Sequence, residues 1–138
     1  MKVVLDLNVI LDVVQEREPF SLSSAAVLQL VVKGKISAVI PGHLLATLYF
    51  VTHKHSSKKQ ANILIDWILK YFDIGSEHKE LFLRARTLQF SDFEDALVAS
   101  VAESEKCHWI VTRNIKDFRK SSIRALTPEE FLVQLEHE

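Results

Sequence analysis

The sequence predicts an α/β protein with a central, mostly parallel sheet of about five strands covered by helices on both faces. Short apolar runs alternate with segments of helical periodicity along all 138 residues, which is typical of parallel strands joined by helices. Only three glycines and three prolines occur, which favours long elements over tight hairpins. Because no repeat, low-complexity tract or linker divides the chain, we expect one domain over residues 1–138.

The expected elements follow from hydrophobic periodicity. Short apolar runs predict strands at residues 2–5, 36–40, 72–74, 108–112 and 123–126. Apolar residues at helical spacing predict helices at 8–14, 21–33, 43–54, 58–71, 77–88, 93–106 and from 128 onward, with one helical turn at 114–118. Gly34 is expected to end the second helix, and Thr127 with Pro128 to begin the last.

Composition excludes several classes of protein. The formal net charge is −1, so contact with nucleic acid requires a local basic patch rather than an overall positive field. The single cysteine, Cys107, excludes an internal disulfide and a cysteine-rich zinc site, and we expect it to pack as a small apolar side chain. The acid-interrupted N-terminus does not resemble a signal peptide, and no apolar run approaches membrane-span length. We therefore expect a cytoplasmic protein without membrane contact.

Polar residues stand where two predicted strands end. Asp6 follows the first strand, and Asn114 and Asp117 follow the fourth, which ends at Thr112. Ligands of parallel sheets bind beyond the carboxyl ends of the strands. Helix capping remains an alternative for Asp6 and for Asn8. Asp12 is expected to be either solvated or ion-paired. As an alternative to a site role, Asn114 would be a helix cap and Asp117 an exposed loop residue.

The stretch "SDFEDALVAS" (91–100) places three acids at a predicted helix start. With Ser91 as the N-cap, Glu94 completes a capping box and is explained by it. Asp92 is favoured by the helix dipole in any case. Asp95 heads the apolar face, so capping does not explain it. Converging with Asp6 and Asp117 in one cleft, it would form a cluster of repelling carboxylates suited to Mg²⁺ or Mn²⁺.

Histidine and basic residues give weaker signals. No zinc-binding or nucleophile–base pattern involves the six histidines, which we expect to be surface or capping residues: His43, His53, His55, His78, His108 and His137. The stretch "HKHSSKK" (53–59) is either a phosphate-contacting patch or a solvated loop. The basic residues expected to contact RNA phosphates flank the proposed cleft: Arg113, Lys116, Arg119 and Lys120.

Three stretches together resemble the PIN-domain family, in particular its bacterial members related to VapC-type toxins. They are "VVLDLNVILDVVQEREPF", "DFEDALVAS" and "IVTRNIKDF", in that order. The resemblance implies a Rossmann-like three-layer α/β/α fold and a Mg²⁺- or Mn²⁺-dependent ribonuclease. It also implies a homodimer and a small antitoxin protein as partner. On this resemblance, the catalytic acids are Asp6, Asp95 and Asp117, and Asp92 joins them as a metal ligand. The supporting residues are Asn8, Asp92, Thr112 and Asn114.

The chain departs from the family at one position. Many members have a glutamate in the helix after the second strand, where this chain has Thr47 within "LLATLYFV". A non-catalytic PIN-like binding module is therefore one alternative. A receiver-like signalling domain with a phospho-accepting aspartate is another. It is disfavoured because the second strand ends in "VIPGH", without an aspartate.

Overall fold

The computed structural model describes all 138 residues and contains one sheet of five parallel strands. The strands are β1 (Lys2–Leu5), β2 (Ser37–Pro41), β3 (Asp73–Gly75), β4 (Trp109–Val111) and β5 (Ala125–Leu126). Their order across the sheet is β3-β2-β1-β4-β5. The five predicted strands are thus confirmed, although β5 covers only the last two residues of the range 123–126.

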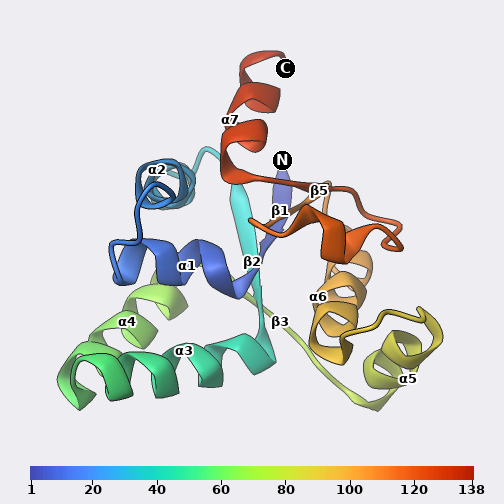
Figure 1. The fold of residues 1–138 in the computed structure, drawn as a ribbon, viewed down its shortest axis with the longest axis horizontal. Coiled ribbons are helices and arrows are strands. Elements are labelled where there is room, and N and C mark those ends of the chain that lie inside the picture. Colours follow the sequence, from blue (N-terminus) through green and yellow to red (C-terminus); the bar gives the residue numbers. More distant parts are fainter.

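Seven helices flank the sheet, and a 3-10 turn follows β4. The helices are α1 (Leu7–Val14), α2 (Ser21–Val32), α3 (Gly42–His55), α4 (Lys58–Tyr71), α5 (Lys79–Thr87), α6 (Phe93–Ser104) and α7 (Pro128–Glu136); the turn is η1 (Ile115–Phe118). Figure 1 shows α1 to α4 on one side of the strands and α5 and α6 on the other. The predicted three-layer arrangement is confirmed. None of the helices combines the length and the hydrophobicity that a membrane span needs.

The core lies on both faces of β1 and β2. Val3, Val4 and Leu5 are fully buried, which explains why β1 is a continuous apolar run rather than an alternating one. Helix α6 packs closely over β3: a Cβ atom added to Gly75 would lie only 2.5 Å from Cγ1 of Val101. This close approach leaves no room for a side chain at position 75, at the end of β3.

The predicted helix boundaries agree closely where capping residues mark them. Gly34 has a φ of +72° just beyond the end of α2, as expected of a residue that ends a helix. Thr127 and Glu130 form a capping box at the start of α7, with Pro128 in the first turn. Cys107 is buried after the end of α6, and burial raises the pKa of its thiol to about 11. It therefore packs as a small apolar side chain, as predicted.

Candidate acidic metal site

Asp6 lies where β1 ends and α1 begins, and its side chain is held by neutral groups alone. One carboxylate oxygen accepts the Leu7 N–H at 2.8 Å; the other accepts the Thr112 hydroxyl at 2.8 Å and the Asn8 amide at 3.4 Å. Asp6 is 8% exposed, and burial raises its pKa above the ordinary value, partly opposed by the Thr112 hydrogen bond. Both predicted roles, helix cap and site residue, therefore fit Asp6.

The loop after β4 is fixed to the end of β1 by polar contacts. The hydroxyl of the buried Thr112 makes two hydrogen bonds: it donates to Asp6 and accepts from the Asn114 N–H at 3.0 Å. The Asn8 side-chain oxygen accepts the Arg113 N–H at 3.2 Å. Asp117 is exposed in η1, and its N–H donates to the Asn114 carbonyl at 3.0 Å. These contacts hold β4 and η1 beside Asp6.

The start of α6 differs from the prediction by one residue. Asp92, not Ser91, is the N-cap: its side chain accepts the Asp95 N–H at 3.0 Å. The predicted capping box of Ser91 and Glu94 is therefore wrong. Serine and aspartate are about equally good caps, so the sequence did not distinguish the two registers. Helix capping explains Asp92 instead, and Glu94 is an exposed residue of the first turn.

Asp95 is the acid most strongly perturbed by its surroundings. Its pKa is raised to about 7, mainly by burial and then by the negative charges of Asp92, Asp6, Asp117 and Glu94. Asp117 also raises the pKa of Asp6. The fold thus brings the three predicted catalytic acids within electrostatic reach of one another, although they are far apart in sequence. Perturbed carboxyl groups that share a site are a feature of functional centres.

The donor chemistry of this cluster fits a hard divalent cation. No three Asp, Glu, His or Cys side chains are close enough in this structure to hold an ion. However, Mg²⁺ keeps several waters and needs only one or two carboxylates directly. The carboxylates of Asp6 and Asp95 form no salt bridge, since neither residue is among the ion pairs of the structure. A divalent cation would relieve their mutual repulsion.

Asp12 and Arg113 form a separate buried pair. Asp12 is fully buried, with Arg113 Nε 2.7 Å and Arg17 Nη1 3.7 Å from its two oxygens. The Arg113 guanidinium also stacks 4.2 Å from the centre of the Phe20 ring. Of the two alternatives for Asp12, ion pairing is thus the correct one. Arg113, predicted to contact RNA, has its charge engaged by this internal partner.

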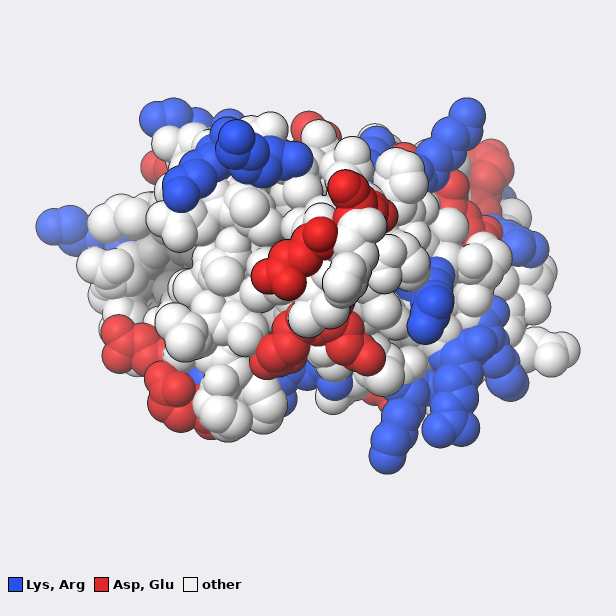
Figure 2. Space-filling view, turned by 90° about the horizontal axis from the view of Figure 1, so that it is seen from above, with Lys and Arg blue, Asp and Glu red and all other residues white.

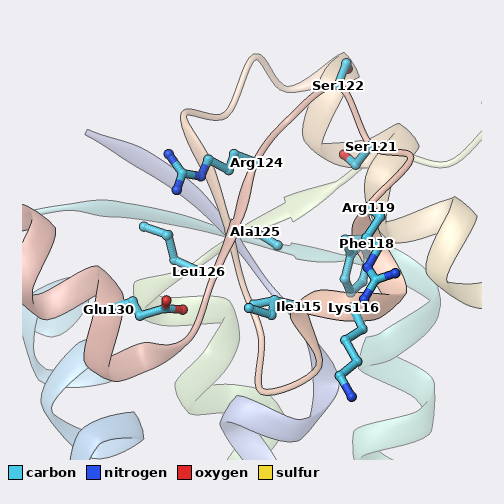
Figure 3. Close-up of a pocket in the computed structure, with 10 residues that line it drawn as sticks. All are labelled: Ile115, Lys116, Phe118, Arg119, Ser121, Ser122, Arg124, Ala125, Leu126 and Glu130. Carbon is cyan, nitrogen blue, oxygen red and sulfur yellow. The ribbon is translucent and has the colours of Figure 1, made fainter.

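The other predicted RNA-contacting residues are exposed in or just after η1. Lys116 and Arg119 line a cavity of about 550 Å³ between η1 and β5. In Figure 3 they extend from the same side of this cavity, whereas Arg124 lies across it. Lys120 Nζ donates to the Gln89 carbonyl at 2.8 Å. Seen from the α7 end in Figure 2, Lys and Arg side chains gather at the lower right, apart from the acids in the middle.

One histidine differs from the prediction. Five of the six are exposed, as expected, but His43 is mostly buried against Glu77. The sequence signal was available: His43 lies just past the end of β2, where the strand-end rule that selected Asp6 also applies.

The stretch 53–59 is the end of α3 and the start of α4, and Ser57 caps α4 through the Gln60 N–H.

Comparisons with known proteins identify the family. Residues 2–116 match the family model described as a PIN domain. Over 134 residues the chain is 31% identical to Ribonuclease VapC1 of Aquifex aeolicus (strain VF5), covering 94% of this chain and 92% of that protein. The chain belongs to the PIN-domain family, as its resemblance predicted, and the receiver-like alternative is no longer retained.

Solved structures agree on the fold. A chain in the crystal structure of VapBC2 from Rickettsia felis, bound to a promoter DNA fragment, superposes with a TM-score of 0.70 at 22% identity, covering 92% of this chain and 98% of that chain. A chain of a toxin–antitoxin complex from Klebsiella pneumoniae also gives 0.70, at 17% identity, covering 91% and 97%. At these identities the likeness supports the fold alone.

Proposed function

We propose that this PIN-domain protein is a Mg²⁺- or Mn²⁺-dependent endoribonuclease that hydrolyses RNA phosphodiester bonds. One observation supports this most: at the carboxyl edge of the sheet the charge of Asp117 helps to raise the pKa values of Asp6 and Asp95, and none of these three acids forms a salt bridge. The relative from Aquifex aeolicus is named a ribonuclease, which agrees with this chemistry.

Each residue of the cluster has a separate role in the proposed reaction. Asp6, Asp95 and Asp117, with Asp92, would hold the metal ion. Bound there, the ion would supply a water of lowered pKa and neutralise charge on the leaving oxygen. Thr112 keeps one carboxylate oxygen of Asp6 in place through its hydroxyl, and such support usually strengthens metal binding.

Asn8 supports the same site through its side chain, and Asn114 supports it through its backbone carbonyl. Asn8 donates to Asp6 and accepts the Arg113 N–H, while Asn114 accepts the Asp117 N–H through its carbonyl. These bonds limit how far the loop after β4 can move. They keep Asp117 beside the other acids when a phosphate approaches.

The RNA backbone would run past η1. Lys116, Arg119 and Lys120 offer exposed positive charge there, which phosphate groups require because the overall net charge of −1 does not attract nucleic acid. Arg113 would contribute mainly by fixing the loop after β4, since Asp12 already pairs with its guanidinium.

The proposed biological role is the toxin of a toxin–antitoxin pair. The structural neighbours include a solved complex described as toxin–antitoxin, which supports a small antitoxin protein as partner of this chain. We also propose a homodimer in the cytoplasm. Coexpression with any short reading frame found directly upstream of the gene, followed by copurification, tests the partner. Light scattering of the purified protein tests the dimer.

A second candidate function is a PIN-like binding module that no longer cleaves RNA. The threonine at position 47, where many relatives have a glutamate, favours this alternative because it removes one carboxylate from the region. The two candidates differ in activity. A catalytic protein cleaves RNA only with a divalent ion, whereas a binding module retains RNA without cleaving it.

The deciding experiment is cleavage of a labelled RNA mixture with Mg²⁺, with Mn²⁺ and with EDTA. Wild-type protein is expected to cleave in both metals and to stop in EDTA. Asp6→Asn and Asp95→Asn are expected to remain folded and inactive. RNA that is retained but not cleaved in any metal would overturn the proposal in favour of the binding module. Full activity of both variants would overturn the assignment of the reaction to Asp6 and Asp95.

A further inference from the structure

A buried histidine–carboxylate pair lies at the carboxyl ends of β2 and β3, in line with the site at the end of β1. His43 is in the first turn of α3, and Glu77 is in the loop after β3. Glu77 Oε1 accepts the His43 backbone N–H at 2.7 Å, and Glu77 Oε2 accepts from the ring nitrogen Nδ1. Both carboxylate oxygens therefore hold the same histidine, and its ring has one fixed orientation.

The packing around this pair leaves little freedom. The His43 and Glu77 side chains are 19% and 10% exposed. A Cβ atom added to Gly42 would lie 3.1 Å from the Gly75 carbonyl and 3.4 Å from Glu77 Oε1, so glycine leaves the space that Glu77 occupies. A second pair close by, His78 and Glu80, is by contrast 58% and 80% exposed. It provides a matched surface control.

His43 stands one helical turn before Thr47, the position at which many relatives have an acid. Residues four apart on a helix share a face, and the Thr47 hydroxyl donates to the His43 carbonyl at 3.3 Å. β2 lies beside β1 in parallel, with Val39 opposite Val4, so Asp6 and His43 both follow the same edge of these two neighbouring strands. His43 thus occupies the helix face on which this chain lacks the family carboxylate.

The second ring nitrogen of His43 has no partner. Nε2 is buried and forms no hydrogen bond, an unfavourable arrangement unless a ligand, ion or water completes it. Histidines that bind metals usually give their other ring N–H to a carboxylate, which fixes the tautomer and makes the free nitrogen a better donor. Glu77 has that relation to His43.

We propose that His43 Nε2 is a ligand of the metal ion bound at the acidic site, with Glu77 as its positioning residue, in place of the carboxylate missing at position 47. This inference rests on the proposed function and specifies its metal. A nitrogen donor favours first-row transition ions over Mg²⁺, which prefers oxygen. The site therefore binds Mn²⁺ more tightly than Mg²⁺.

The direct test is pulsed electron paramagnetic resonance of Mn²⁺ added to the purified full chain. Nitrogen bound to Mn²⁺ modulates the electron spin echo, and ¹⁵N-histidine labelling identifies that nitrogen as imidazole. We expect the histidine modulation in wild type and in His78→Ala, and its loss in His43→Ala and His43→Gln. A merely structural role for His43 would give no such modulation in wild type.

Calorimetry of Mn²⁺ and Mg²⁺ binding adds a quantitative measure. Replacing a ligand or its carboxylate partner typically weakens metal binding by about 10- to 100-fold, so His43→Gln and Glu77→Gln are expected to lose this much Mn²⁺ affinity. Their Mg²⁺ affinity should change by less than about threefold, because imidazole adds little to an oxygen site. His78→Ala should leave both affinities unchanged.

The outcomes separate this inference from the proposed function. If Mn²⁺ binds and Asp95→Asn abolishes its binding, but wild type shows no histidine modulation, His43 is not a ligand and the ribonuclease proposal stands. If wild type binds neither Mn²⁺ nor Mg²⁺, both proposals are overturned. Because the wild-type spectrum decides the matter, a variant that fails to fold does not obscure the result.

Discussion

Two buried aspartates at opposite ends of α1 have contrasting surroundings. Asp12 is completely buried and pairs with Arg113 at 2.7 Å and with Arg17 at 3.7 Å. Asp6, 8% exposed, receives hydrogen bonds only from neutral donors. A carboxylate removed from water needs compensation for its lost hydration. Asp12 has that compensation within the chain, whereas Asp6 has only part of it.

This difference separates a structural acid from a candidate functional one. The Asp12–Arg113 pair joins α1 to the loop after β4. It also neutralises the charge of Arg113, which was predicted from the sequence to contact RNA. At Asp6, burial raises the pKa and the charge of Asp117 raises it further, so an external cation would improve its environment. Burial of an acid is therefore a weaker indication of function than burial without a counter-ion.

The largest expected effect is on stability, from Asp12→Asn. Removing one partner of a buried ion pair typically costs about 3–5 kcal/mol, because the remaining charge is left uncompensated. We expect the free energy of unfolding in urea to fall by about 3 kcal/mol, since Arg113 retains some contact with water. RNA cleavage per folded molecule should fall far less than in Asp6→Asn, because Asp12 does not hold the metal. A loss of cleavage without a loss of stability would contradict the division between the two aspartates.

Asp6→Asn is expected to affect RNA cleavage rather than stability. Asparagine caps helices as well as aspartate does, so the unfolding free energy should change little. Cleavage should fall by about a hundredfold or more, because a neutral amide is a poor ligand for a hard divalent ion. Circular dichroism serves as the folding control. Activity within a few-fold of wild type would remove Asp6 from the catalytic group.

Asp95 is expected to make the stability of the metal-free protein depend on pH, unlike an acid with an internal counter-ion. Its pKa is about 7 in the folded chain against an ordinary value of 3.8. A raised pKa means that the folded state binds the proton more tightly, so stability is lost as the pH rises from about 4 to about 7. Asp95→Asn removes this loss. After allowance for solvent screening, we expect the variant to gain about 1–2 kcal/mol over wild type at pH 8.

Urea unfolding in EDTA at pH 4 and pH 8 measures that gain. At pH 4 the two proteins should differ least, because the carboxyl group is largely protonated in the folded state. An equal difference at both values of pH would mean that the pKa of Asp95 is not raised in the folded protein. Asp66→Asn is the matched control, since Asp66 lies on α4 and is not among the charges that raise the pKa of Asp95.

The smallest expected effect concerns the start of α6. Because Asp92 caps the helix, Asp92→Ala should lower the unfolding free energy by about 1 kcal/mol. Ser91→Ala and Glu94→Gln should change it by less than about 0.5 kcal/mol, since neither residue caps the helix and exposed substitutions rarely do more. Thermal melts of the three variants test this order. A larger loss in Ser91→Ala than in Asp92→Ala would restore the capping box predicted from the sequence.

The fold was predictable because its signals are local. The apolar runs of β1 and β2 and the helix pattern of 58–71 identify these elements without knowledge of their neighbours. The strand-end rule selected Asp6 and Thr112 for the same reason. The one-residue error at α6 was also local, because adjacent Ser91 and Asp92 are both good caps.

The pairings within and around the site were not predictable in the same way. His43 meets Glu77 only because β2 and β3 are neighbours that end together, with Pro41 opposite Gly75. Arg113 meets Asp12 only because β4 lies beside β1. Neither contact leaves a periodic signal in the sequence. Both change the interpretation of residues that the sequence had assigned to the surface or to RNA.

Titration with Mn²⁺ at pH 8, followed by the thermal stability of wild type and of Asp95→Asn, is the sharpest test of the proposed metal site. An ion that binds only the folded state stabilises it by about 1.4 kcal/mol for each tenfold increase above its dissociation constant. We expect the melting temperature of wild type to rise and that of Asp95→Asn to stay nearly constant. An equal response of the two proteins, or no response in wild type, would contradict a metal site at these carboxylates.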